Sequence, residues 1–430
     1  MQTLIRGGHI LTLDPDDREL TGDVLVDGDR IAAIGSLDAP GAQVIDANGM
    51  VVLPGLIDTH RHTWQTALRH RGAAWSLPDY LSILLTDLAA RYRPDDVYAG
   101  TLLGALGAID AGVTTLVDWS HIQKSPEYTE ASVRALTDAG LRAVFAHGWP
   151  IGAERRPADL RLARGLLPDD DAPVTLAMAA HGPDFTDAET AAADFHLARE
   201  LGVPVTAHVA VGRPGPDQRG IATLAAAGLL GPDLTVVHAN GASDTDLALL
   251  AEHGVSVSIS PQIELTMPGL GADVAVRRML AAGLSPSLST DSETAASGDL
   301  FTQMRIALAV HRSAAPEPPL PAYRVLRMAT RDAAAAAGLA DRTGSLEVGR
   351  AADIILLRAT DLNLAPLSHP ADAVVLAAHP GNVDTVLVAG TVLKRGGRLV
   401  ADVERARELA YASVRRLVPD SVRTQPVPAV

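Results

Sequence analysis

Short apolar runs rich in β-branched residues alternate with longer Ala- and Leu-rich segments between residue 55 and about residue 340. The short runs predict buried strands, and the longer segments have the apolar spacing of helices. The pattern predicts eight strands, at residues 56–62, 114–121, 142–149, 174–182, 203–210, 234–241, 256–261 and 284–292. Eight strand–helix units in a segment of this size are typical of a (β/α)8 TIM barrel, an α/β fold.

An open, doubly wound sheet is the competing α/β topology. That fold carries a Gly-rich phosphate-binding turn after its first strand. The sequence TWQTALRHRG follows the first predicted strand here and contains no such turn. The barrel is therefore the favoured prediction.

Both ends of the chain have a different pattern, in which short β-like runs are separated by turns. The runs at the start are TLIRGGHILTL, DVLVDGDRIAAIG and AQVIDANGMVVLPG, and those after Gly338 are TGSLEVGRAADIILL and VDTVLVAGTVLKRGGRLV. Strand clusters this small are marginal alone. We therefore expect residues 1–54 and 342–400 to join in one small split β-sandwich domain beside a barrel of residues 55–341. Residues 401–430 are expected to form a C-terminal helix, Val403–Leu417, and a tail.

The composition excludes several classes of partner and cofactor. The 430 residues include 36 Lys and Arg against 51 Asp and Glu, a net charge of −15, which disfavours nucleic acids and anionic membranes as partners. No apolar run approaches the roughly 18 residues of a transmembrane helix, and the first residues lack the apolar core of a signal peptide. The absence of cysteine excludes disulfides, iron–sulfur clusters and cysteine nucleophiles. We expect a cytoplasmic protein with a small-molecule substrate, and a homodimer is the default oligomer.

The histidines are concentrated in one part of the predicted barrel. The chain has 14 histidines but only two lysines, Lys124 and Lys394, so metal or acid–base chemistry must use imidazole and carboxylate groups. At the C-terminal ends of barrel strands, side chains from different strands converge on one site. Seven histidines lie at or near such ends: His60, His62, His121, His147, His181, His208 and His238.

Three of these histidines, together with an aspartate at another strand end, are expected to form a set of metal ligands. His60 and His62 are two residues apart on the first strand, so their side chains point to the same side. With His208 at the end of the fifth strand and Asp291 at the end of the eighth, they give three imidazoles and one carboxylate. Such a set leaves a coordination position open for water, as in catalytic metal sites. Taken singly, each histidine could instead be a hydrogen-bonded core residue, and Asp291 could cap a helix.

At this point the sequence resembles the amidohydrolase superfamily, in particular the chlorohydrolase and deaminase branch that includes triazine hydrolases. The resemblance covers essentially the whole chain. It rests on PGLIDTHRH, TALRHRG, GVTTLVD, TAHVA, VVHAN, STDS followed by GDLFTQMR, and the closing TGSLEVGRAADIILL.

The resemblance implies a single divalent metal ion on His60, His62, His208 and Asp291. Zn²⁺ is the default, although Fe²⁺, Mn²⁺ and Co²⁺ suit the same ligands. It also implies that Asp291 moves the proton of a metal-activated water and that His238 contacts the oxygen that becomes charged. Members with two metals bridge them with a lysine at the end of the fourth strand, and here that strand ends in His181.

One position departs from the family pattern. Deaminases of this branch carry a glutamate three residues after the fifth-strand histidine, where it protonates the substrate ring, and here that position is Val211. A valine cannot move a proton. Glu264, in SPQIELTMPG, is the proposed substitute, with His181 and Glu293 as further candidates; the alternative for Glu264 is a solvated loop carboxylate.

The expected function is a metal-dependent hydrolase that cleaves a C–N bond, by deamination or by amide or amidine hydrolysis, in a small cyclic nitrogen compound. One alternative is hydrolytic removal of chloride or a thiol from an aza-ring or carbamate carbon, which Val211 makes harder to dismiss. Another is a catalytically silent ligand-binding barrel. The predicted substrate contacts, each with structural packing or support as its alternative, are Trp64, Gln65, His121, His147, His181 and Glu293.

Overall fold

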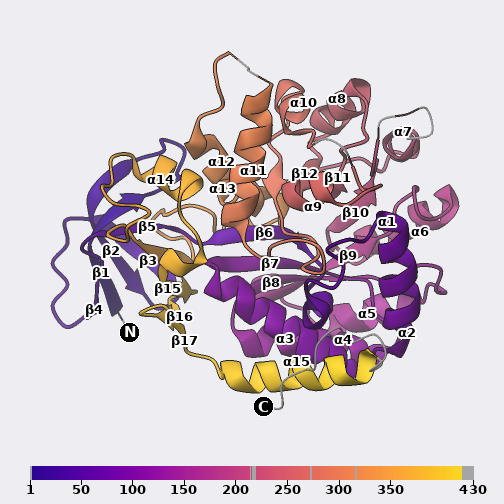
Figure 1. Ribbon diagram of the computed structural model, residues 1–430, viewed down its shortest axis with the longest axis horizontal. Helices are drawn as coiled ribbons and strands as arrows, with labels where there is room; N and C mark the ends of the chain where they lie inside the picture. Colours follow the sequence, from indigo (N-terminus) through magenta and orange to yellow (C-terminus); the bar gives the residue numbers. More distant parts are fainter. Residues whose placement is uncertain (1, 214, 216–218, 272–273, 315–316, 419–430) are drawn as a thin grey trace.

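The eight-stranded sheet of the protein is a closed parallel barrel, and a second, nine-stranded sheet lies beside it (Figure 1). The computed structural model describes residues 2–213, 215, 219–271, 274–314 and 317–418. The eight barrel strands pair in sequence order: β6 (Leu56–Arg61), β7 (Val113–Ser120), β8 (Arg142–His147), β9 (Val174–Ala180), β10 (Val205–Val209), β11 (Leu234–His238), β12 (Ser256–Ile259) and β13 (Ser287–Leu288). A parallel bridge between Arg61 and Asp291 joins the last segment to the first strand, so the TIM barrel predicted from the apolar pattern is confirmed.

The eighth strand is much shorter than the predicted run of residues 284–292. The chain changes its partner there: the Ser289 N–H donates to the Ile259 carbonyl at 2.9 Å, and the Asp291 N–H donates to the His60 carbonyl at 3.0 Å. Asp291 itself has a positive φ of 61°, which ends regular strand geometry. The segment therefore closes the barrel with a few backbone hydrogen bonds to each of its two neighbours, β12 and β6.

Each barrel strand is followed by at least one helix. Between β6 and β7 lie a 3₁₀ turn, η1 (Thr63–Leu68), then α1 (Leu77–Asp79), a π-helix, η2 (Tyr80–Leu88), α2 (Ala89–Arg91) and the long α3 (Pro94–Asp110). The later helices are α4 (Pro126–Ala139), α5 (Pro157–Leu166), α6 (Ala188–Glu200), α7 (Gly220–Ala226), α8 (Asp244–Glu252), α9 (Pro261–Thr266), α10 (Val276–Ala281), α11 (Leu300–Ser313), α12 (Ala322–Met328) and α13 (Arg331–Ala336).

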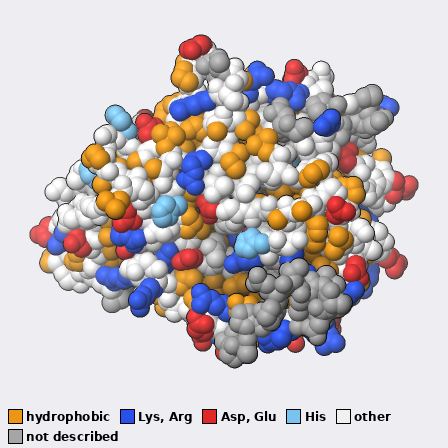
Figure 2. Space-filling model, viewed as in Figure 1, with side chains coloured by type: hydrophobic (Ala, Val, Ile, Leu, Met, Phe, Trp, Pro, Cys, Tyr) orange, Lys and Arg blue, Asp and Glu red, His pale blue; other side chains and the backbone are white. Residues whose placement is uncertain are grey.

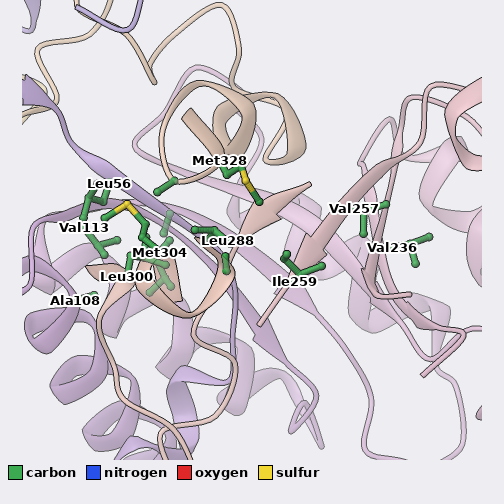
Figure 3. Close-up of a cluster of buried hydrophobic side chains, with 14 of the residues drawn as sticks. Leu56, Ala108, Val113, Val236, Val257, Ile259, Leu288, Leu300, Met304 and Met328 are labelled. Carbon is green, nitrogen blue, oxygen red and sulfur yellow. The ribbon is translucent and has the colours of Figure 1, made fainter. Parts of the chain in front are cut away.

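The barrel core lies between the strands and these helices. Figure 3 shows strand residues such as Leu56 and Leu288 beside Leu300 and Met304 of α11. Inside the barrel, by contrast, hydroxyl groups meet: Thr59 Oγ1 lies 2.7 Å from Ser258 Oγ. Burial of this apolar layer stabilises the barrel, because about 25 cal/mol is gained per Å² of apolar surface removed from water.

Both ends of the chain share the second sheet, as predicted (Figure 1). Its strands are β1 (Gln2–Leu11), β2 (Glu19–Asp27), β3 (Arg30–Gly35), β4 (Gln43–Asp46), β5 (Met50–Pro54), β14 (Ile354–Arg358), β15 (Val383–Val388), β16 (Thr391–Arg395) and β17 (Arg398–Leu399). The order is β17-β16-β15-β14-β5-β1-β2-β3, with β4 paired to β1, so β5 and β14 join the two ends. Short helices α14 (Pro370–Leu376) and η3 (Pro380–Asn382) connect β14 to β15.

A single glycine links the two sheets. Gly55 alone separates β5 from β6, and a Cβ atom there would lie 2.0 Å from Thr114 Oγ1. Only glycine can occupy this close approach. The first barrel strand is thereby a direct continuation of the terminal sheet.

The predicted C-terminal helix is α15 (Val403–Leu417), which runs beside α3 (Figure 1). The Ser413 hydroxyl donates to the Asp96 carboxylate at 2.7 Å, and Arg416 forms an ion pair with the same group. The predicted tail at residues 419–430 lies outside the described residues. Among the described helices, none combines the length and the apolar character that crossing a membrane requires.

Candidate active site

His60 and His62 lie together at the C-terminal end of β6. Their ring centroids are 4.7 Å apart, because residues two apart on a strand face the same side. The intervening Arg61 points away from them and pairs with Asp58 and Glu293. One strand therefore directs two imidazoles to the barrel mouth, while the guanidinium of Arg61, between them in the sequence, is buried on the opposite side of the strand.

A backbone carbonyl fixes the tautomer of His62. Its Nδ1 lies 3.0 Å from the Trp119 carbonyl oxygen, which can only accept, so Nδ1 carries the proton. Nε2 is then a free lone pair that faces Asp291, 3.3 Å from Oδ1. This is the arrangement of a metal-binding histidine held by its second nitrogen.

His208 and Asp291 complete the cluster. The His208 ring lies 4.8 Å from that of His60, and Asp291 Oδ1 lies 3.6 Å from His60 Nε2. Two groups have ligand atoms within 4.8 Å of one another: His60, His62 and His208, and His60, His238 and Asp291. Asp291 and His238 both adopt positive φ angles, which are uncommon for residues other than glycine and concentrate at functional sites.

The protonation states of this cluster suit a cation. Burial, with the neighbouring His60, lowers the pKa of His62 to about 3, and burial likewise holds the pKa of His208 well below its ordinary value. Burial alone would raise the pKa of Asp291, but the surrounding histidines outweigh it and lower the pKa. Within the described residues, neither ring nitrogen of the buried His60 has a hydrogen-bond partner. Neutral imidazoles beside an ionised carboxylate are the forms that bind a divalent metal.

His238 is held between two carboxylates. Its Nδ1 lies 2.9 Å from Glu264 Oε1, and its Nε2 lies 3.6 Å from Asp291 Oδ2. Burial opposes protonation, but the hydrogen bond and charge of Glu264 outweigh it and raise the pKa of His238. Glu264 is fully buried and also accepts the Ser260 N–H at 2.8 Å, so it is not a solvated loop carboxylate.

The cluster lies at a cavity with about 580 Å³ of empty space. Its lining falls into two groups. The polar members are His62, Tyr80, His121, His181, His208, His238, Asp291 and Ser292. The apolar members are Leu77, Leu81, Leu85, Trp119, Ile151, Phe185, Val211, Ile263, Met267 and Leu270. Asp291 is thus the sole carboxylate among the described lining residues.

Two further histidines in the cavity wall have opposite hydrogen-bonding capacity. The guanidinium of Arg155 donates to His181 Nδ1 at 2.9 Å, and burial lowers the pKa of His181 to about 4, so Nε2 carries a proton that can be donated. His121 Nδ1 lies 3.4 Å from the Trp119 carbonyl, and burial lowers its pKa well below the ordinary value. The Nε2 of His121 is therefore an acceptor.

The other predicted substrate contacts lie behind the cavity wall. Trp64 is fully buried, with its ring 4.9 Å from that of Tyr92, and His147 is fully buried beside Trp149. Gln65 is buried between Tyr80 and Ser292, and Glu293 pairs with Arg61 and Arg69. Two of the predicted substrate contacts, His121 and His181, are among the described lining residues. The other four are not: Trp64, Gln65, His147 and Glu293. Glu264, the predicted substitute for the missing glutamate, is not among them either.

The sequence pattern did not reveal the apolar wall or Tyr80. Four of the ten apolar residues come from α1, η2 and α9, which are short or non-α elements without a strong period, and five others lie in loops. The π-helix is the feature that could have drawn attention, since π-helical turns are frequent at functional sites, but it is visible only in the structure.

Comparisons with known proteins give one consistent relationship. The model of the amidohydrolase family matches residues 51–393. The 5-methylthioadenosine/S-adenosylhomocysteine deaminase of Desulforudis audaxviator is 31% identical, over 97% of this chain and 99% of that protein. The 5′-deoxyadenosine deaminase of Methanosarcina acetivorans is also 31% identical, over 96% of this chain and 98% of that protein.

Solved structures agree with the fold. A mutant of the atrazine chlorohydrolase of Arthrobacter aurescens TC1, complexed with zinc and atraton, superimposes with a TM-score of 0.87 at 26% identity, over 96% of this chain and all of that one (100%). An adenosine deaminase of Xanthomonas campestris with bound zinc gives a TM-score of 0.87 at 25% identity, over 96% and 98% of the two chains. With the family match spanning most of its length, this chain belongs to the amidohydrolase family, as its motifs predicted.

Proposed function

We propose that this protein is a metal-dependent hydrolase that cleaves a carbon–nitrogen bond in a small, cyclic nitrogen compound. The observation that carries the proposal is that His62, His208 and Asp291 line one cavity, with His60 directly beside them. The names of the similar proteins, which are deaminases and a triazine-type hydrolase, support the same class of reaction.

The donor set fits one divalent metal ion. The imidazoles of His62 and His208, which burial keeps neutral, one ionised carboxylate and the unpaired nitrogens of His60 are what such an ion requires. Zn²⁺ is our choice because two similar structures contain zinc, although Fe²⁺, Mn²⁺ and Co²⁺ suit the same ligands. When bound, the ion lowers the pKa of a water molecule to about 7 and so supplies hydroxide at neutral pH.

Side chains of the protein transfer the proton of the attacking water and stabilise the negative charge that develops on oxygen. Asp291 takes the proton of the attacking water and passes it to the leaving nitrogen. His238, 3.6 Å from Asp291, donates to the oxygen on which negative charge develops. Glu264 acts through His238, which it holds in position by the 2.9 Å hydrogen bond, and does not itself reach the substrate.

Two cavity histidines orient the substrate. His181 offers an N–H donor and His121 offers a lone pair, so a ring that presents both an acceptor and a donor is bound in one orientation. The other four predicted contacts support the site without lining the cavity, since each is buried against neighbouring side chains: Trp64, Gln65, His147 and Glu293.

Two observations favour a second reaction on the same site, the removal of chloride or a thiol from an aza-ring. Val211 supplies no proton to a ring nitrogen, and a chloride leaving group needs none. Six neighbouring wall residues are apolar, which suits alkyl substituents better than a sugar: Leu77, Leu81, Leu85, Ile263, Met267 and Leu270.

A combined metal and product assay tests both reactions. The protein is purified without chelator, its metal content is measured, and aminated and chlorinated triazines and pyrimidines are screened for released ammonia, amine and chloride. About one metal ion per chain, with ammonia or amine release that a chelator abolishes, supports C–N hydrolysis. Chloride release alone moves the assignment to the second reaction, and a metal content far below one ion per chain contradicts both.

A further inference from the structure

Tyr80 lies in the wall of the cavity, at the point where α1 passes into η2. It is the first residue of the π-helix η2, it is 8% exposed, and its ring lines the cavity together with Asp291 and Ser292. No family motif in the sequence includes it. Its surroundings nevertheless determine what its hydroxyl can do.

A chain of directed hydrogen bonds makes the Tyr80 hydroxyl an acceptor from the protein. The Ser292 hydroxyl donates to Gln65 Oε1 at 2.6 Å, which turns the amide nitrogen of Gln65 toward Tyr80. Gln65 Nε2 then donates to the Tyr80 hydroxyl oxygen at 2.7 Å. All three side chains are buried, so this orientation is held by packing as well as by hydrogen bonds.

The proton of Tyr80 consequently has no acceptor among the described residues, because Gln65 is the hydrogen-bond partner of that hydroxyl and it donates. Burial, with the charge of Asp291, raises the pKa of Tyr80, so the phenol stays protonated over the working range of an enzyme. A buried O–H that faces a cavity without an acceptor is costly unless a ligand supplies one.

The position that would otherwise supply a proton donor is apolar. Val211 packs against the same buried cluster as Tyr80 and Ile263. The cavity wall therefore lacks a carboxylic acid there, while a phenolic donor stands in the same lining.

We propose that Tyr80 donates a hydrogen bond to an unprotonated ring nitrogen of an aza-aromatic substrate, next to the carbon that water attacks. This inference rests on the proposed function and specifies its substrate class: a compact ring with an acceptor nitrogen and apolar substituents.

The donated hydrogen bond stabilises the negative charge that reaches the ring nitrogen when the water oxygen adds to the adjacent carbon. Tyr80 keeps its proton throughout. The new C–O bond replaces the bond to the leaving nitrogen, and that nitrogen departs with the proton of the water, carried by Asp291. The electron pair of the broken bond leaves with the nitrogen, so no oxidant or reductant is required.

The test compares two ligands in two proteins. The zinc-loaded wild type and Tyr80→Phe are titrated calorimetrically with 2-(isopropylamino)pyrimidine and with N-isopropylaniline, in which C–H groups replace the ring nitrogens, at pH 8. We expect the wild type to prefer the pyrimidine by at least about tenfold and Tyr80→Phe to lose that preference. Turnover of an aza-ring substrate by Tyr80→Phe should fall about 10- to 100-fold in kcat/KM.

Tyr98→Phe is the matched control, because that tyrosine lies on α3, donates to Asp138 of α4 away from the cavity, and should keep the wild-type preference. Equal preference in wild type and Tyr80→Phe, or no preference in the wild type, overturns the inference. The outcomes separate the two proposals. A preference that depends on Tyr80 without any C–N hydrolysis contradicts only the proposed function, whereas hydrolysis with an unchanged preference in Tyr80→Phe contradicts only this inference.

Discussion

Arg61 and Glu293 form an ion pair across the line where the first and last strands of the barrel meet. Both side chains are buried, and Arg61 also pairs with Asp58, whose carboxylate accepts the Thr290 hydroxyl at 2.6 Å. The proposed ligands His60 and His62 flank Arg61 in the sequence, and Asp291 lies two residues before Glu293. We therefore expect the pair to hold the proposed metal ligands on opposite sides of the seam at a fixed spacing.

Replacing Arg61 with Met should destabilise the protein by about 3 kcal/mol, because it leaves buried carboxylates without their cation. Urea denaturation measures this loss. Arg161→Met is the control, since its pair with Glu200 is exposed and should contribute less than about 1 kcal/mol. Equal effects of the two substitutions would refute the role of the seam.

His60→Gln should abolish stoichiometric metal binding, because His60 belongs to both groups of potential ligands. His147→Gln is the matched control: it is equally buried at the end of β8, two strands away from β6, but belongs to neither group among the described residues. Metal analysis of the purified variants measures the difference. Retention of one ion per chain by His60→Gln would show that the ion binds elsewhere.

The contribution of Asp194 to the free energy of unfolding should decrease as the pH rises from 4 to 7. Burial raises the pKa of Asp194 from 3.8 to about 6, although Arg155 opposes the shift. The folded state holds this proton more tightly than the unfolded state, so the stabilisation is complete below about pH 4 and is lost as the pH passes 6. The free energy of unfolding of the wild type should therefore fall over this interval relative to that of Asp194→Asn. If the free energies of the two proteins change with pH in parallel, the effect is excluded.

Val211→Glu should increase ammonia release from aminated aza-rings by at least about tenfold, since a carboxylic acid at that position can protonate the ring. Val211→Gln has a similar size and no transferable proton, so it controls for the change in cavity shape. If the two variants have equal rates, proton donation from this position does not limit the reaction.

Much of the fold could be predicted because barrel strands are buried on both faces and appear in the sequence as separate apolar runs. That the strand-end histidines lie close together could also be predicted, since the topology of a barrel brings the C-terminal ends of its strands to one face. Predicting that Trp64 or Gln65 touches substrate from their nearness to His62 in the sequence was less secure, because η1 turns both side chains into the packing. The partners of His181 and Tyr80 come from distant segments, and no local pattern specifies such pairs.

The direct passage from β5 to β6 through Gly55 has a consequence for the order in which the protein is made. During synthesis His60 and His62 leave the ribosome early, but β5 gains its neighbour β14 only after residue 358 has been added. Asp291, too, comes more than half a chain later than His62. The proposed metal site and its supporting sheet can therefore be completed only after residue 358 has been made, and a nascent chain that stalls before β14 would carry His60 and His62 without a finished site.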